Sequence, residues 1–194
     1  MCQIPLEPEE LGKVACVDAE DYDQLAQHTW YVAVDHPNYC YAFRWITDNK
    51  IAFRRSMHEE VLRFKSSRHR VIDHINRNAL DNRKENLRIC SAQQNCWNRR
   101  PSQNKKSSKY KCVMYQRRAN RSGKGQCHVS KPWRVRICRN RKESIEIRFA
   151  DEYDAYLKSQ EMLQEYHGDF AYLVPWTGYS NSQYPNKPIN YQPT

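Results

Sequence analysis

The sequence predicts a mixed α+β fold, in which short antiparallel strands are combined with a few short helices. Two observations favour this class: brief alternating or β-branched runs recur along the whole chain, and helical apolar patterns follow several of them. With 194 residues, there is room for one large or two small domains, each with a modest core. A mean hydropathy of −1.00 indicates a polar, surface-rich protein.

The first seventy residues are expected to form a small α+β unit. Ser56 and Glu59 have the spacing of a capping box, which predicts a helix from there to Phe64. His58 lies one residue inside that helix, and we expect it to pack or cap rather than react. His69, which stands between two arginines, is expected at the surface or in contact with phosphate. The other elements predicted here are a strand over 13–17, a helix over 18–28 and antiparallel strands over 30–34, 39–45 and 51–55.

The stretch Val71–Arg99 has the pattern strand, loop, strand, helix. The β-branched run over 70–73 ends at Asp73, and a polar loop with the turn-forming pairs Asn-Arg and Asp-Asn leads to a second run over 86–90. Ser91 then suits the N-cap of a helix that carries several Gln and Asn residues.

Residues able to do metal or proton chemistry stand at each junction of this stretch. A returning loop would let Asn86 face His74, and Asn95 on the following helix could point into the same cleft. Hard oxygen donors such as Asp73 and Asn95 suit Mg²⁺. A neutral histidine can accept a proton from water. The pattern favours a phosphodiester-hydrolysing site, although Asn-rich loops are also common turns and a single histidine is usually a polar surface residue.

The combined motif resembles that of HNH nucleases, in the form found in phage and intron-encoded homing endonucleases. The matching residues are Asp73-His74, Asp81-Asn82-Arg83, Asn86-Leu87-Arg88 and Asn95. The resemblance implies a ββα-metal (His-Me) finger in which His74 is the general base. It also implies that Asp73 and Asn95 bind one Mg²⁺ or Mn²⁺ ion and that Asn86 orients His74.

The formal charge of +10 is unevenly distributed. Residues 1–35 hold eight acids and one base, whereas residues 86–142 hold seventeen Lys and Arg and no acid. Such a stretch is typical of a polyanion-binding surface, and double-stranded DNA is the expected partner. Arg83, Arg88 and Arg99 are expected to hold phosphates near the site. An anionic membrane is the alternative, disfavoured because no basic amphipathic helix stands out.

The C-terminal half predicts three strands and a helix behind a basic linker over 101–109. Arg134 and Arg136 alternate with three apolar residues in the central strand, and Asp151 suits the cap of a helix that ends near Gly168. The apolar face of this helix is expected to carry Tyr153, Tyr156, Leu157 and Leu163. The expected strands cover 110–117, 132–137 and 144–149.

This half resembles the AP2/ERF-type DNA-binding domain. The matching segments are 108–113, 133–137 and 149–155, with Cys112 where the family has a glycine. The resemblance implies a three-stranded antiparallel sheet packed on one helix, with Arg117, Arg134 and Arg136 contacting the major groove or phosphates. The alternative is that these arginines only solvate an exposed face. The tail over 175–194 is expected to be extended and to lie over this domain through Trp176 and its tyrosines.

Cysteine usage predicts free thiols. Eight cysteines are scattered singly and no Cys-x-x-Cys pair occurs, so a zinc site from Cys112, Cys127, His128 and Cys138 is disfavoured. No apolar run of roughly 18 residues is present. The N-terminal residues do not resemble a secretory signal, so an intracellular protein is expected, with no membrane association and no obligate protein partner.

Taken together, the patterns favour a DNA endonuclease of the HNH homing type whose finger cuts and whose C-terminal sheet positions the cut. The alternative is a DNA-binding regulator that keeps the finger as a scaffold, and an RNA-processing nuclease is a third reading. The expected parts are an N-terminal unit (1–70), the nuclease motif (71–100), the linker (101–109), the AP2-like domain (110–174) and the tail (175–194).

Overall fold

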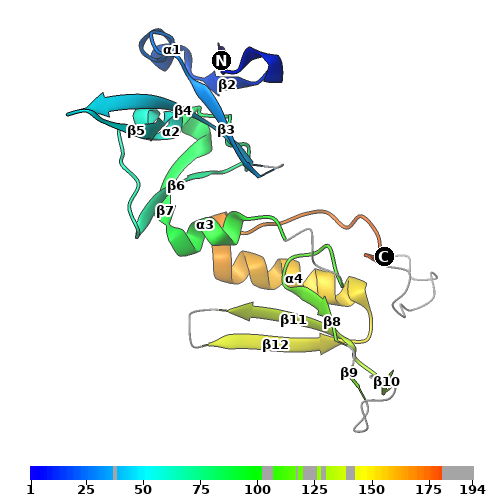
Figure 1. Ribbon diagram of the computed structural model, residues 1–194. Helices are drawn as coiled ribbons and strands as arrows, with labels where there is room; N and C mark the ends of the chain where they lie inside the picture. The colour runs from blue at the N-terminus through cyan, green and yellow to red at the C-terminus, as the bar shows by residue number, and fades with distance from the viewer. Residues whose placement is uncertain are drawn as a thin grey trace. The chain divides into compact units, whose positions relative to one another are not determined.

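The computed structural model shows two compact units, Met1–Asn98 and Arg99–Thr194. It describes residues 1–36, 39–101, 107–116, 118–119, 126–127, 130–138 and 143–180. In these residues no helix is long and apolar enough to cross a membrane. Short antiparallel sheets and a few helices make up both units, which confirms the α+β class (Figure 1).

The first unit contains three antiparallel sheets, with strand orders β1-β2, β3-β4-β5 and β6-β7. The order of elements also matches the expected alternation of strands and short helices. The elements are β1 Cys2–Pro5, β2 Val14–Val17, α1 Ala19–Leu25, β3 Tyr31–His36, β4 Tyr39–Asp48, β5 Ile51–Ser56, α2 Met57–Val61, β6 Arg70–His74, β7 Leu87–Ser91 and α3 Ala92–Asn98, with 3₁₀ turns at Glu9–Leu11 and Lys84–Asn86.

One hydrophobic core serves this whole unit. Ile72 of β6 and Leu87 of β7 are buried in the same cluster as Trp30 and Met57 from the preceding elements. The strand–loop–strand–helix stretch is therefore not a separate body, and burial of these apolar side chains fixes it against the sheets that precede it.

The helix α2 differs from the expected one in its cap and its length. Ser56 is the N-cap residue, yet its side chain makes no capping hydrogen bond. The Glu59 carboxylate instead accepts the main-chain N–H of Ser66 at 2.8 Å, which draws it away from the start of the helix. The helix ends at Val61, and Arg63 takes a left-handed backbone with φ of 47° that cannot continue it.

The second unit has a three-stranded antiparallel sheet of order β12-β11-β8 and one long helix, as expected. Trp133, Val135 and Ile137 of the central strand are buried, and Met162 and Leu163 of α4 lie in the same cluster. The elements are β8 Val113–Tyr115, β9 Arg118–Ala119, β10 Gln126–Cys127, β11 Trp133–Cys138, β12 Ser144–Phe149 and α4 Glu152–His167, followed by a 3₁₀ turn at Gly168–Phe170.

The ends of α4 are those predicted, and three of the four residues expected on its apolar face, Tyr153, Tyr156 and Leu163, pack in the hydrophobic cluster of this unit. The Asp151 carboxylate accepts the N–H of Tyr153 at 2.7 Å, and Gly168 follows the last turn with a φ of 52°. Leu157 was expected on the apolar face and is 48 % exposed, whereas Met162 is buried. The reason is helical periodicity: positions 155, 156, 159, 162 and 163 share one face, and 157 lies beyond its edge.

Residues 174–180 pack against α4 and the segment around Tyr110 of the same unit. The Trp176 ring stacks on Tyr110 with centroids 4.8 Å apart, and the Tyr110 hydroxyl donates to the Gly178 carbonyl at 2.7 Å. The buried Glu152 carboxylate accepts the N–H of Ser180 at 2.9 Å. The expectation that the tail lies over this domain is confirmed as far as Ser180, and the rest of the tail lies outside the described residues.

Candidate active site

The strand–loop–strand–helix arrangement predicted from the sequence is present. In the β6-β7 ladder Asp73 lies opposite Arg88, and His74 lies opposite Leu87. The helix α3 begins directly after β7 with a capping box. The Ser91 hydroxyl accepts the N–H of Gln94 at 3.1 Å, and the Gln94 side chain accepts the N–H of Ser91 at 2.9 Å. Ser91 is thus the predicted cap, and it fixes where the helix leaves the sheet.

Asp73 is buried between an arginine and an amide. Its Oδ2 accepts Nε and a terminal nitrogen of Arg88 at 2.9 and 2.8 Å. The Asn98 side-chain amide donates to both carboxylate oxygens at 3.1 Å. Asp73 is therefore held from the neighbouring strand on one side and from the end of α3 on the other.

The α3 side chain that meets Asp73 in the structure is Asn98, whereas Asn95 was expected there. The Asn98 amide also donates to the carbonyl oxygen of His74 at 3.0 Å, and this residue is 3 % exposed. Asn95 is half-buried one turn earlier. Because residues three apart lie on one face of a helix, Asn95 shares the face that Asn98 presents to Asp73.

His74 is held by an amide and by a second histidine. Its Nε2 lies 3.3 Å from Oδ1 of Asn82, which is fully buried. The His58 ring, from α2, meets the His74 ring edge-on, with centroids 5.3 Å apart and an interplanar angle of 89°. His58 packs, as expected, but it packs against the residue chosen as the general base.

Asn86, which was expected to orient His74, bonds to other parts of the loop instead. Asn86 Oδ1 accepts the N–H of Asn76 at 2.9 Å, and its Nδ2 donates to the Asp81 carbonyl at 2.7 Å. The side chain of Asn86 therefore spans the loop, because the 3₁₀ turn at Lys84–Asn86 directs it there. Asn82 takes the place beside the imidazole.

Both histidines have lowered pKa values. Burial is the main cause at His74, where the Asn82 hydrogen bond and the charges of Asp73 and Asp81 act in the opposite direction. Burial, with the nearby His74 second, lowers the pKa of His58 from 6.5 to about 4, against the raising effect of Glu59. At neutral pH both rings are therefore neutral, and a neutral imidazole can accept a proton.

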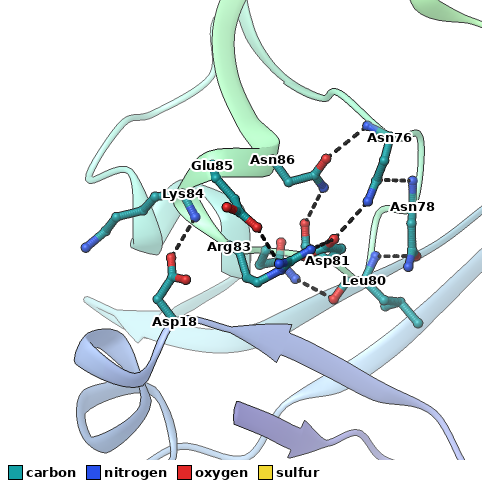
Figure 2. A network of polar contacts seen from close by, with 10 residues as sticks. Asp18, Asn76, Asn78, Leu80, Asp81, Arg83, Lys84, Glu85 and Asn86 are labelled. Atoms are coloured by element: carbon teal, nitrogen blue, oxygen red, sulfur yellow. Dashed lines mark hydrogen bonds and ion pairs between the residues drawn. The ribbon is translucent and has the colours of Figure 1, made fainter. Parts of the chain in front are cut away.

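The loop between the two strands is fixed by its own side chains (Figure 2). Asn76 donates to the Asp81 carboxylate at 2.8 Å and accepts the N–H of Asn78 at 2.8 Å. Arg83 binds both oxygens of Asp81 at 2.8 Å, and this guanidinium lowers the pKa of Asp81. Turn-forming residues predicted a loop here, and their mutual bonds make it an ordered one.

The same loop is tied to the start of the chain. The N–H of Cys16 in β2 donates to the Leu80 carbonyl at 2.8 Å, and the N–H of Asn82 donates to the Cys16 carbonyl at 2.8 Å. The Asp18 carboxylate accepts the N–H of Lys84 at 2.8 Å, as Figure 2 shows. Asn82, and with it His74, is consequently positioned by contacts with a strand near the N-terminus.

The arginines expected to contact nucleic acid occupy different surroundings. Arg83 and Arg88 form ion pairs inside the first unit, with Asp81 and Asp73 respectively. Arg99 is exposed. On the sheet of the second unit, Arg136 is exposed and Arg134 pairs with Glu146 at 3.2 Å. Arg117 lies outside the described residues.

The donors that Asp73 offers to a cation at this site are oxygens. The described part of the chain contains no group of three or more His, Cys, Asp and Glu side chains that could hold a metal. Among the described residues, seven cysteines are not part of a disulfide: Cys2, Cys16, Cys40, Cys90, Cys96, Cys112 and Cys138. Within the described residues Asp73 Oδ1 accepts one hydrogen bond, from Asn98, so this oxygen keeps a lone pair. A carboxylate oxygen of this kind fits Mg²⁺, which takes oxygen ligands and retains several waters. The Asn98 amide turns its nitrogen to Asp73, so its oxygen is not a ligand beside this carboxylate.

Three residues of the site were not placed in it from the sequence. Asn82 was noted only as part of the matching motif, Asn98 only as one of the amide residues of the predicted helix, and His58 only as a packing or capping residue before the motif. No family model matches the chain, and no curated protein and no solved structure matches it either. The functional assignment therefore depends on the residues themselves and on their geometry.

Proposed function

We propose that this chain is a DNA endonuclease of the HNH homing type, which hydrolyses a phosphodiester bond with one divalent metal and is positioned by an AP2-like domain. The observation that carries the proposal is the placement of His74. It stands at the end of β6 of a ββα arrangement, next to Asp73, with Asn82 on one ring nitrogen. A general base needs this combination of a neutral imidazole and a fixed orientation.

His74 would act through Nδ1. When Nε2 carries the hydrogen, it donates to Oδ1 of Asn82, and Nδ1 keeps the lone pair that accepts a proton from the attacking water. The Asn82 amide is itself oriented, since its Nδ2 donates to the Leu80 carbonyl at 3.3 Å. Asn82 is thus a positioning residue, and the Asn86-bridged loop supports it.

Asp73 and Asn95 are the residues proposed to hold Mg²⁺ or Mn²⁺. A bound cation supplies stabilisation of negative charge on the scissile phosphate. Arg88 and Asn98 keep the Asp73 carboxylate in place beside His74. Arg99, exposed at the start of the second unit, remains a proposed phosphate contact.

The sheet of the second unit is the proposed site for duplex DNA. Its outer face carries Arg134, Arg136 and Arg148, with Glu146 as the acid among them. The opposite side chains of β11 are buried, so these arginines point away from the core. Charges on an exposed sheet face can neutralise phosphates and release counterions.

A second function has one observation in its favour. Asp73 is paired with Arg88, and Asp81 with Arg83, so the polar groups of the finger also satisfy one another. Such a network could serve as the scaffold of a DNA-binding regulator that does not cut.

The test is cleavage of supercoiled plasmid by the full chain with Mg²⁺, with Mn²⁺ and with EDTA. We expect metal-dependent nicking that falls by about 10²–10⁴ in His74→Ala, with duplex binding unchanged. His69→Ala is the matched control, because His69 is an exposed histidine of the same unit. Tight binding without cutting in either metal would support the regulator, and full cutting by His74→Ala would place the base elsewhere.

A further inference from the structure

One face of the β3-β4-β5 sheet carries a row of aromatic rings. The Phe43 ring lies 5.8 Å from that of Tyr31, 6.2 Å from that of Tyr41 and 5.9 Å from that of Trp45, measured between centroids. The strand register explains the row: Tyr31 lies opposite Phe43 across β3 and β4, and Tyr41 and Trp45 follow at spacings of two along β4.

This face is not the one that builds the core. Ala42 lies on the opposite face of β4 and is buried in the hydrophobic cluster of the unit, with Val32 of β3 packed against the same cluster. On the aromatic face, Trp45 is 50 % exposed and Tyr31 is 36 % exposed. Phe43, which lies between these two rings, is 6 % exposed. Large exposed aromatic rings on a small unit are a feature of interaction surfaces, because leaving such area in water is unfavourable.

The Arg54 side chain lies over the Phe43 and Trp45 rings. The Arg54 guanidinium is 4.7 Å from the Phe43 centroid and 5.4 Å from the Trp45 centroid, and Arg54 lies directly opposite Trp45 in the ladder. Arg54 is itself exposed. The planar cation and the indole therefore form one surface, on which a further flat ring can stack.

The charge around this surface is positive. Residues 43–56 hold four basic side chains, Arg44, Lys50, Arg54 and Arg55, against one acid, Asp48. Arg44 is paired with Glu60, and Arg55 lies opposite Arg44 on the other face of the sheet. Lys50 at the hairpin turn and Arg54 are therefore the local positive charge on the side of the rings. An apolar protein partner would have to desolvate these groups, whereas a nucleic-acid strand offers a phosphate for them and a base for the ring.

We propose that Trp45 and Arg54 form a stacking platform for an unpaired base of single-stranded DNA, with the buried Phe43 ring supporting Arg54 and the exposed Tyr31 ring extending the surface. Exposed aromatic rings on a sheet and neighbouring arginines are the means by which proteins bind single strands. The choice of DNA rather than RNA rests on the proposed nuclease function, since the platform belongs to the same unit as His74. The strand β5, which supplies Arg54, continues directly into α2, which supplies His58.

The test is binding of the full chain to a labelled oligonucleotide of about 12 thymidines, followed by fluorescence anisotropy in EDTA. We expect Trp45→Ala to weaken this binding by about tenfold, Trp45→Phe to restore most of it, and Arg54→Ala to weaken it as well. Ile51→Ala, at an exposed apolar residue of the same hairpin, is the matched control and should bind like the wild type.

An abasic strand of the same length separates stacking from charge. Trp45→Ala should bind the abasic strand and a blunt duplex as the wild type does. Equal losses on the thymidine and abasic strands, no loss at all, or tighter binding of the wild type to the matching RNA would each overturn the proposal. Because EDTA suppresses metal-dependent cutting, these outcomes are independent of whether the chain nicks plasmid.

Discussion

The two units use the same kinds of charged residue in opposite ways. In the first unit, Asp73 is 5 % exposed and its partner Arg88 is 18 % exposed, and the pair lies inside a network that includes His74. In the second unit, Arg134 and Glu146 are 22 % and 33 % exposed on the face of a sheet. A buried pair fixes geometry, whereas an exposed pair contributes little stability and can exchange its partner for a phosphate.

A buried carboxylate alone does not make a reactive site. Glu152 in the second unit is fully buried, as Asp73 nearly is, but its neighbours are the hydroxyl of Ser108 at 2.8 Å and the N–H of Ser180 at 2.9 Å. These bonds join the start of α4 to two distant segments of chain. Asp73 differs because it adjoins an imidazole and amide-bearing helix residues, and this difference separates a structural acid from a proposed metal ligand.

The largest expected effect comes from removing the buried acid. Asp73→Ala should lower the free energy of unfolding by about 4 kcal/mol, since it takes the carboxylate from both Arg88 and Asn98. Glu146→Ala, the matched change at the exposed pair, should cost less than about 1 kcal/mol. Urea denaturation followed by tryptophan fluorescence measures both. Similar losses in the two variants would contradict the contrast between the units.

The second effect is the pH dependence that burial of His58 gives the first unit. Burial also lowers the pKa of His167 in the second unit to about 4, so the measurement compares variants at position 58. Because the folded-state pKa of His58 is lowered from 6.5 to about 4, the unfolded chain binds a proton first as the pH falls. Stability is therefore lost between pH 6.5 and about 4 and is unaffected by this group at higher pH. The loss amounts to about 3 kcal/mol by pH 4.

The variant His58→Phe keeps a ring against His74 and removes the ionisable group. Its unfolding free energy should fall about 3 kcal/mol less than that of the wild type between pH 7 and pH 4. His69→Phe, at an exposed histidine, should follow the wild-type curve. Parallel pH curves for wild type and His58→Phe would show that His58 is not buried in its neutral form.

The smallest expected effect tests the basic face of the second unit. Arg134→Ala and Arg136→Ala should each weaken duplex binding roughly uniformly across sequences and reduce the log–log salt slope by about 1. Lys158→Ala is the control, because Lys158 lies on α4 and pairs with Glu161. Anisotropy titrations over a range of salt concentrations give both quantities. An unchanged slope in the arginine variants would mean that this face only solvates the sheet.

Local patterns predicted the elements because their causes are local. The β-branched run before Asp73, the short run around Leu87, the capping residue Ser91 and the alternation in β11 each indicate a strand or a helix start without help from distant residues. These signals also predicted Asp73 and His74 at the end of a strand. The run over 70–73 therefore accounts for the positions of Asp73 and His74 in the site.

Long-range contacts decide the remainder of the site. Whether Asn82 or Asn86 faces His74 depends on how the loop docks on Cys16 in β2, and loop composition does not encode that docking. The approach of His58 to the His74 ring depends on how α2 packs against β4 and β5. Charge counting likewise could not separate Arg88, which pairs with Asp73, from Arg136, which is exposed.

The central claim is that the first unit cuts DNA and the second unit binds it. The most direct test of this division measures cutting and binding on one labelled duplex. The variants are His74→Ala and the double variant Arg134→Ala/Arg136→Ala, with rates in Mg²⁺ and affinities in EDTA. We predict that His74→Ala loses cutting by at least about 100-fold and keeps its affinity, while the double variant loses affinity and keeps its rate at saturating DNA. A double variant that cuts slowly at saturation, or a His74→Ala variant that binds as poorly as it cuts, would contradict that division.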